Sequence, residues 1–211
     1  MEFSAKNFSN KMNKIIFASN NINKVIEIRK ILEGKYEILT LKEAGLEIEI
    51  PEPHDTMELN ALEKARTIFN LKGTTCFAED SGLEVDALGG EPGVLSARYA
   101  GTHGDDQKNI EKLLHNMQDV ENRNARFRTV ISLIDNGENK FFEGTCEGTL
   151  TYQQRGNNGF GYDPIFIPLG FDKTFAECTP EEKNAVSHRK KAMKQMIEYL
   201  LPENNRTENK I

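Results

Sequence analysis

Two long segments with the composition of β-strands, residues 125–134 and 140–152, flank the dipeptide Asn136-Gly137. Asn-Gly between two β-prone segments is typical of the two-residue turn of a β-hairpin. A turn this short joins antiparallel neighbours only, so the hairpin excludes an all-parallel sheet. The sequence therefore predicts an α/β fold with an elongated, twisted, mixed β-sheet and helices on both sides.

The spacing of apolar residues predicts the other elements. Asp55, with Glu58 three residues later, has the pattern of a helix N-cap, and Thr179 with Glu182 repeats it. The predicted strands cover residues 14–19, 36–41, 74–78, 83–88 and 165–167. The predicted helices cover residues 23–33, 55–73, 105–117 and 179–201, the last with a break near residue 187.

The composition limits the possible functions. The chain has 211 residues and a net charge of −6, which argues against broad nucleic-acid binding. It shows no apolar run of transmembrane length and no signal peptide, and its three cysteines form no CxxC, so we expect a cytoplasmic protein with no membrane partner. We expect one domain over residues 13–201, a disordered extension over 1–12 and a flexible tail over 202–211.

The stretch FAEDSG places Glu79 and Asp80 side by side directly after a predicted strand, followed by a turn at Ser81-Gly82. Adjacent carboxylates repel each other unless a cation pairs with them. Magnesium prefers such ligands and shares its shell with phosphate oxygens, and Glu52 could join the pair. The alternative is a solvated turn.

The stretch SNNINK, residues 19–24, lies between the first strand and the first helix. Free N–H groups at a helix N-terminus bind anions, and Lys24 in the first turn can reach the same anion. The alternative is a capped loop with a solvated lysine.

Two further stretches, GNNGFGYDP and EEKNAVSHRKKA, lie toward the end of the chain. Phe160 and Tyr162 offer flat faces for a base, unless both rings lie in the core. Lys183, His188 and Arg189 form a donor cluster, unless they belong to a solvated basic helix face. Together the four stretches provide the groups that bind a nucleoside triphosphate and magnesium.

Four motifs carry a family resemblance: KIIFASNNINK, FAEDSGLEVDALGGEPGVLSARYAG, GFGYDPIF and EEKNAVSHR. In this order and spacing they resemble the inosine triphosphatase family, also called XTP/dITP pyrophosphatases. The resemblance covers residues 14–201. It implies magnesium-dependent hydrolysis of ITP, dITP and XTP to the monophosphate and pyrophosphate, which removes deaminated purines from the nucleotide pool, and it implies a homodimer.

The resemblance also assigns roles to individual residues. It implies that Asp80 is the proton acceptor and a metal ligand, assisted by Glu52, with Glu79 as the neighbouring acid. The substrate-binding positions that it implies are Ser19, Asn20, Asn21, Ile22, Asn23, Lys24, Ser81, Phe160, Gly161, Tyr162, Asp163, Lys183, His188 and Arg189.

Two departures from the family pattern concern the metal and the phosphates. Glu79 stands where many members have aspartate, and the first loop reads SNN where TGN is common. Two alternative functions remain open: a pyrophosphatase for modified pyrimidine or methylated nucleotides, and a nucleotide sensor without turnover. A sensor is disfavoured because binding a triphosphate alone calls for cations rather than for clustered carboxylates.

Overall fold

The computed structural model of the protein describes residues 13–200, so the extension predicted over 1–12 and the tail predicted over 202–211 lie outside the described residues. The strands are β1 (Asn13–Phe17), β2 (Tyr36–Leu39), β3 (Cys76–Val85), β4 (Asn124–Asp135), β5 (Glu138–Leu150) and β6 (Phe166–Pro168). The α-helices are α1 (Ile22–Leu32), α2 (Met57–Lys72), α3 (Asp106–Asn116), α4 (Pro180–Val186) and α5 (His188–Leu200). Short 3-10 helices are η1 (Asp86–Leu88), η2 (Gly93–Arg98), η3 (Asp163–Ile165) and η4 (Phe175–Glu177).

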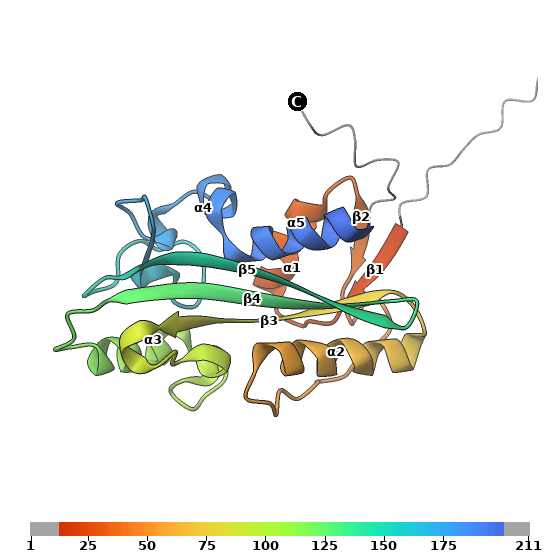
Figure 1. Ribbon diagram of the computed structural model, residues 1–211, viewed down its shortest axis with the longest axis horizontal. Helices are drawn as coiled ribbons and strands as arrows, with labels where there is room; N and C mark the ends of the chain where they lie inside the picture. The colour runs from red at the N-terminus through yellow and green to blue at the C-terminus, as the bar shows by residue number, and fades with distance from the viewer. Residues whose placement is uncertain (1–12, 201–211) are drawn as a thin grey trace, which may run out of the picture.

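The strands form one sheet in the order β2-β1-β3-β4-β5-β6. β1 is parallel to β2 and β3, and the other neighbours are antiparallel, which confirms the predicted mixed sheet. The β4–β5 hairpin closes at Asn136 and Gly137, whose φ angles of 50° and 84° are those of the turn that Asn-Gly favours. Figure 1 shows these two strands running along most of the length of the molecule.

The stretch FAEDSG does not contain a turn, and the prediction of a break at Ser81-Gly82 is wrong. β3 continues without interruption through it and pairs with β4 over its whole length, from Cys76 opposite Ile134 onward. Gly82 is there for another reason. A Cβ at this position would collide with the carbonyl oxygen of Gly93, so the glycine lets η2 pack directly onto the strand.

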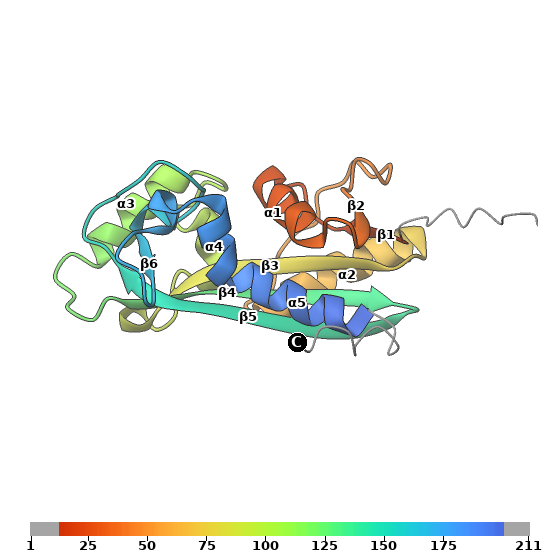
Figure 2. The ribbon, with the colours of Figure 1, turned by 90° about the horizontal axis from the view of Figure 1, so that it is seen from above.

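Helices cover both faces of the sheet, as predicted (Figures 1 and 2). Phe77 and Ile131 point to one face and pack in a core cluster with α1 and α5. Cys76 and Ala78 point to the other face and pack against Ala65 of α2. Between residues 13 and 200, no helix has both the length and the apolar content needed to cross a membrane.

The two predicted capping boxes had different outcomes. Thr179 caps α4, with Glu182 completing the box, and the predicted break is confirmed because α4 ends at Val186 and α5 begins at His188. The prediction for α2 is wrong by one residue: Thr56, and not Asp55, caps the helix by accepting a hydrogen bond from the N–H of Leu59 at 3.3 Å. The new start at His188 brings its side chain and that of Arg189 to the sheet.

Candidate active site

A cavity of about 830 Å³ lies at the carboxyl end of β1. β1 pairs with only Cys76 and Phe77 of β3, so the next part of that strand borders the cavity. In the sheet, β2 lies on one side of β1 and β3 lies on the other, so the direction in which the chain adds strands reverses at β1. Open α/β sheets bind ligands at such a reversal point.

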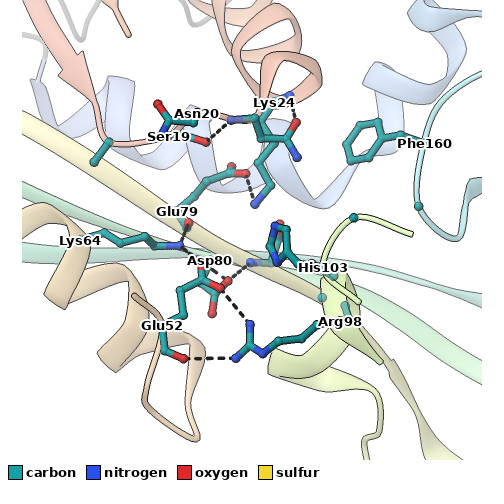
Figure 3. A pocket seen from close by; sticks show the side chains of 18 of the residues that line it. Ser19, Asn20, Lys24, Glu52, Lys64, Glu79, Asp80, Arg98, His103 and Phe160 are labelled. Carbon is teal, nitrogen blue, oxygen red and sulfur yellow. Dashed lines mark hydrogen bonds and ion pairs between the residues drawn. The ribbon is translucent and has the colours of Figure 1, made fainter. Parts of the chain in front are cut away.

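The cavity brings together most of the predicted site residues (Figure 3). Ile22 and Asn23 are the exceptions. The side chain of Ile22 is among the exposed apolar ones, and Asn23 lines a smaller cavity of about 240 Å³ on the other side of Phe160. The predicted residues that line the main cavity are Ser19, Asn20, Asn21, Lys24, Glu52, Glu79, Asp80, Ser81, Phe160, Gly161, Tyr162, Asp163, Lys183, His188 and Arg189.

The predicted phosphate loop lies at the N-terminus of α1, on the cavity wall. Asn21 is the N-cap, and its Oδ1 accepts a hydrogen bond from the N–H of Lys24 at 3.1 Å. Ser19 Oγ accepts one from the N–H of Asn21 at 3.1 Å, and Asn20 Nδ2 donates to the carbonyl of Ile48 at 3.2 Å. The loop is therefore ordered by its own polar side chains without the glycine of the common family pattern.

Glu79 is a fully paired carboxylate. Its oxygens accept hydrogen bonds from Arg189 Nε at 2.9 and 3.1 Å, and Lys24 Nζ lies 3.1 Å from Oε1. Burial acts to raise the pKa of Glu79, but Arg189 and Lys24 outweigh it and lower the pKa to about 2. Glu79 is therefore ionised at neutral pH, with its charge already compensated by two cations.

Asp80 is much less well paired. Its Oδ1 accepts a hydrogen bond from the N–H of Ser81 at 3.0 Å, its Oδ2 accepts one from Asn60 at 3.3 Å, and the nearest ammonium, Lys64 Nζ, lies 3.8 Å away. Burial raises the pKa of Asp80, Lys64 opposes this, and the charge of Glu52 adds to it. Asp80 is thus a buried carboxylate that has a raised affinity for a proton.

Glu52 lies in the irregular segment between β2 and α2 and is held by two cations. Lys64 Nζ donates to Oε1 at 2.5 Å, and Arg98 donates to Oε2 and to the main-chain carbonyl, both at 3.2 Å. Burial acts to raise the pKa of Glu52, but Lys64 outweighs it, with Lys24 and Arg98 in support, and the pKa is lowered.

The three predicted metal ligands do not converge. Between residues 13 and 200, no three His, Cys, Asp or Glu side chains are grouped so that they could hold a metal ion together. Glu79 points toward Lys24, whereas Asp80 points toward Lys64 (Figure 3). Asp80 and Glu52 still fit magnesium, because they already share one cation, Lys64, and Mg²⁺ is usually held by one or two carboxylates plus substrate phosphates.

The glycine-rich loop and the start of α5 form the opposite end of the cavity. Phe160 is half-buried, and Lys183 Nζ lies 4.7 Å from the centre of its ring. Asp163 Oδ2 accepts hydrogen bonds from the N–H of Phe160 at 3.0 Å and from Lys183 at 2.7 Å. Tyr162 is in the core, where its hydroxyl donates to the carbonyl of Ser96 at 3.0 Å. Phe160 is therefore the ring of this loop that is placed to stack on a base.

His188 and Arg189 differ in how far their hydrogen bonds are satisfied. The guanidinium of Arg189 is bonded to Glu79, Glu27 and Ser81. His188 stacks on Phe127 with ring centres 4.9 Å apart, and its Nδ1 has no partner within residues 13–200. Burial, followed by the charge of Arg189, lowers the pKa of His188 well below 6.5, so its imidazole is neutral.

Sequence reasoning missed several side chains that line the cavity, among them Lys64, Arg98, His103 and Asp106. Lys64 had a signal, because it lies within the buried stripe of α2 between Ala61 and Ile68, where a lysine requires a partner. Asp106 accepts a hydrogen bond from the N–H of Gly161 at 2.7 Å and so fixes the loop of Phe160. No local signal singled out the other two.

Comparison with known proteins identifies the family. The Ham1 family model matches residues 15–199, and the chain belongs to that family. A protein of Porphyromonas gingivalis named dITP/XTP pyrophosphatase is 51% identical over 191 residues, which are 90% of this chain and 98% of that protein. One of the same name from Bacillus subtilis is 46% identical over 90% of this chain and 98% of its own length.

Solved structures agree with the sequence relatives. The Ham1 protein of Staphylococcus aureus superposes with a TM-score of 0.81 at 40% identity, covering 89% of this chain and 98% of that one. A HAM1 protein from Coxiella burnetii gives a TM-score of 0.82 at 37% identity, with coverage of 90% and 98%. The resemblance and the fold predicted from the four motifs are both confirmed.

Proposed function

We propose that this chain hydrolyses non-standard purine nucleoside triphosphates, namely ITP, dITP and XTP, to the monophosphate and pyrophosphate, and so removes deaminated purines from the nucleotide pool. The observation that carries the proposal is the placing of a poorly paired carboxylate, Asp80, between a helix N-terminus and an aromatic loop in one cavity. The names of the relatives support the same activity.

In the proposed reaction, a water oxygen forms a bond to the α-phosphorus. The bond from that phosphorus to the bridging oxygen breaks, and pyrophosphate leaves with the bonding electrons. The proton of the water passes to the carboxylate of Asp80, which is buried in the cavity and lies 3.8 Å from Lys64. Lys24 and the N–H groups at the start of α1 stabilise the charge on the phosphates.

We further propose that the enzyme depends on magnesium held by Asp80 and Glu52. When bound, Mg²⁺ would neutralise phosphate charge and lower the pKa of water. Glu79 remains a prediction as a ligand, and its pairing with Arg189 and Lys24 makes it the weakest of the three candidates. Glutamate is longer than the aspartate that is common in the family, and the side chain of Glu79 reaches Arg189 and Lys24.

The proposed activity is tested by measuring pyrophosphate release from ITP, ATP and dTTP with and without magnesium. Release from ITP at a kcat/KM at least tenfold above that for ATP supports the proposal. Preference for dTTP or a methylated nucleotide would favour the alternative pyrophosphatase, and tight ITP binding without release would favour a sensor. Loss of release on chelation, restored by Mg²⁺, tests the metal.

Two further parts of the proposal concern the assembly and the compartment. We propose a homodimer, which the family resemblance supports, and light scattering on the purified chain tests it by measuring the molar mass. We propose the cytoplasm as the location, which is supported by three free and buried cysteines, the state that a reducing compartment maintains.

A further inference from the structure

Of the two proposed metal ligands, Arg98 contacts Glu52. Its guanidinium donates from Nη1 to Glu52 Oε2 and from Nη2 to the Glu52 carbonyl, both at 3.2 Å. No hydrogen bond or ion pair joins Arg98 to Asp80 within residues 13–200. Lys64 differs, because it contacts Glu52, the carbonyl of Glu79 and, at 3.8 Å, Asp80.

Glu52 needs such support because nothing in its own segment fixes it. Residues 40–56 form no helix or strand, so the position of the carboxylate depends on contacts with other elements. Arg98 holds both the side chain and the main chain of Glu52, which fixes the direction of the carboxylate as well as its location.

Arg98 is itself fixed relative to β3. It ends η2, and Ser96 of that helix accepts a hydrogen bond at Oγ from the N–H of Leu83 at 2.9 Å. Tyr162 donates to the Ser96 carbonyl from the other side, and Gly82 leaves room for close packing. The contacts therefore form a rigid path from the strand that carries Asp80, through η2, to Glu52.

We propose that Arg98 is a positioning residue that acts through Glu52, holding that carboxylate where it and Asp80 share one divalent cation. The proposal rests on the proposed function, in which these two carboxylates are the metal ligands. Arg98 fixes the separation of the two carboxylates before the metal binds. Its removal weakens metal binding and leaves the chemical step of the metal-saturated enzyme largely intact.

The test measures Mn²⁺ affinity by electron paramagnetic resonance on the full chain, with the α,β-methylene analogue of ITP present. Arg98→Met keeps an unbranched, largely aliphatic stem and removes the charged guanidinium. Loss of a residue that orients a metal ligand typically costs 10- to 100-fold in metal affinity, so a rise of about tenfold or more in the Kd for Mn²⁺ is expected. The KM for Mg²⁺ should rise in parallel, with kcat at saturating Mg²⁺ changed by less than about threefold.

Three further variants complete the test. Arg126→Met is the matched control, because Arg126 also bonds acidic side chains and is similarly exposed, at 32% against 28%, but lies outside the cavity. It should leave Mn²⁺ affinity unchanged. Arg98→Lys, which keeps the charge, should give an intermediate affinity. In a Glu52→Gln background, Arg98→Met should have no further effect, because its route to the metal is already lost.

Several outcomes overturn the proposal. Unchanged Mn²⁺ affinity in Arg98→Met and Arg98→Lys, with weaker binding in Glu52→Gln, overturns it and leaves the proposed function intact. A lower kcat at saturating Mg²⁺ with normal affinity makes Arg98 a phosphate ligand instead. Equal effects of Arg98→Met in the presence and absence of Glu52 exclude the route through Glu52. Equal Mn²⁺ affinity in wild type and Glu52→Gln overturns the proposal together with the metal assignment.

Discussion

Glu79 and Asp80 are neighbours in β3, and the alternation of a strand sends their side chains to opposite faces of the sheet. Glu79 faces α1 and α5 and accepts hydrogen bonds from Arg189, the nearer at 2.9 Å. Asp80 faces α2, where its nearest cation is 3.8 Å away. The pKa is lowered to about 2 for Glu79 and raised for Asp80, although both carboxylates are buried.

The difference shows that the partner, rather than burial, decides what a buried carboxylate can do. On the Glu79 face, three carboxylates alternate with three cations in one network: Asp163, Lys183, Glu27, Arg189, Glu79 and Lys24. On the Asp80 face, both cations lie closer to Glu52 than to Asp80. The first arrangement fixes the end of the cavity formed by the glycine-rich loop and the start of α5, and the second leaves one carboxylate less tightly paired, as a proton acceptor or a metal ligand would be.

The strongest test of this comparison is the loss of the Asp80 charge. Asp80→Asn should lower kcat for ITP by about 10³-fold, within the range that general-base catalysis contributes, because the amide cannot accept the proton. Stability should be unchanged or slightly higher, because the raised pKa means that burial disfavours the ionised carboxylate. Pyrophosphate release and urea unfolding measure the two effects.

The control for Asp80→Asn is Asp86→Asn, which removes a carboxylate that pairs with Arg126 outside the cavity and should leave kcat unchanged. Near-normal turnover of Asp80→Asn in saturating Mg²⁺ would remove Asp80 from the catalytic assignment. That result would also mean that Asp80 and Glu79 do not differ in their contribution to turnover.

Glu79→Gln should differ from Asp80→Asn in that its main effect is a loss of stability. Gln keeps the shape of the side chain but removes one of the two carboxylates that pair with Arg189 and the carboxylate that pairs with Lys24. Removal of one partner of a buried ion pair is strongly destabilising, so the free energy of unfolding should fall by about 3 kcal/mol. Urea unfolding at pH 7.5 with an unchanged m-value measures it. If the free energy of unfolding falls no more in Glu79→Gln than in Asp80→Asn, the two carboxylates do not differ in how much their ion pairs stabilise the fold.

The sequence predicted what short segments determine. Asn136-Gly137 specifies the hairpin, and the capping box at Thr179 specifies the start of α4. The place of the loop over residues 19–24 before α1 could be predicted because its polar residues bond to one another within four positions. For α2, adjacent Asp55 and Thr56 both have cap-forming side chains, so composition alone did not select between them.

Residues distant in the sequence determine what the sequence did not reveal. Gly82 has the composition of a turn, but its function is to admit Gly93, which approaches from another segment. The adjacent acids of EDSG suggested two metal ligands. Nothing near Glu79 in the sequence indicated that the guanidinium of Arg189 would neutralise its carboxylate. Arg98 gained significance only when the fold placed it beside Glu52.

The Glu79 face also makes a prediction about base recognition. Arg189→Ala is a poor test, because it removes the cation that Glu79 and Glu27 share and so disturbs the whole network. His188→Phe is better, because it keeps the stack on Phe127 and removes both ring nitrogens. A hydrogen-bond donor aimed at the 6-keto group of hypoxanthine would favour ITP over ATP, and its loss should lower kcat/KM for ITP by about 10- to 100-fold.

The readout for His188→Phe is kcat/KM for ITP, ATP and GTP measured side by side. The value for ATP should change little, so the ITP/ATP ratio should narrow. GTP also has the 6-keto group, and it should remain a poor substrate if its 2-amino group is what excludes it. An equal loss on ITP and ATP would mean that His188 supports the fold of this face without reading the base.

The smallest expected effect is a pH dependence of stability that belongs to the Glu79 face. The charged and titratable groups around His188 are Arg189, Lys183, Lys24 and Glu79; only the last favours protonation, and burial opposes it most strongly. The unfolded chain takes up a proton at His188 near pH 6.5, whereas the folded chain does so only at a much lower pH. Stability from this residue is therefore complete well above pH 6.5 and is lost as the pH falls, with a slope that approaches about 1.4 kcal/mol per pH unit well below pH 6.5. Between pH 6.5 and 5.5, urea unfolding should show wild type losing about 1 kcal/mol more than His188→Phe, which has no such proton to bind. Identical pH slopes in the two proteins would mean that the imidazole is protonated in the folded state, and that the cations of this face are not already matched by its three carboxylates.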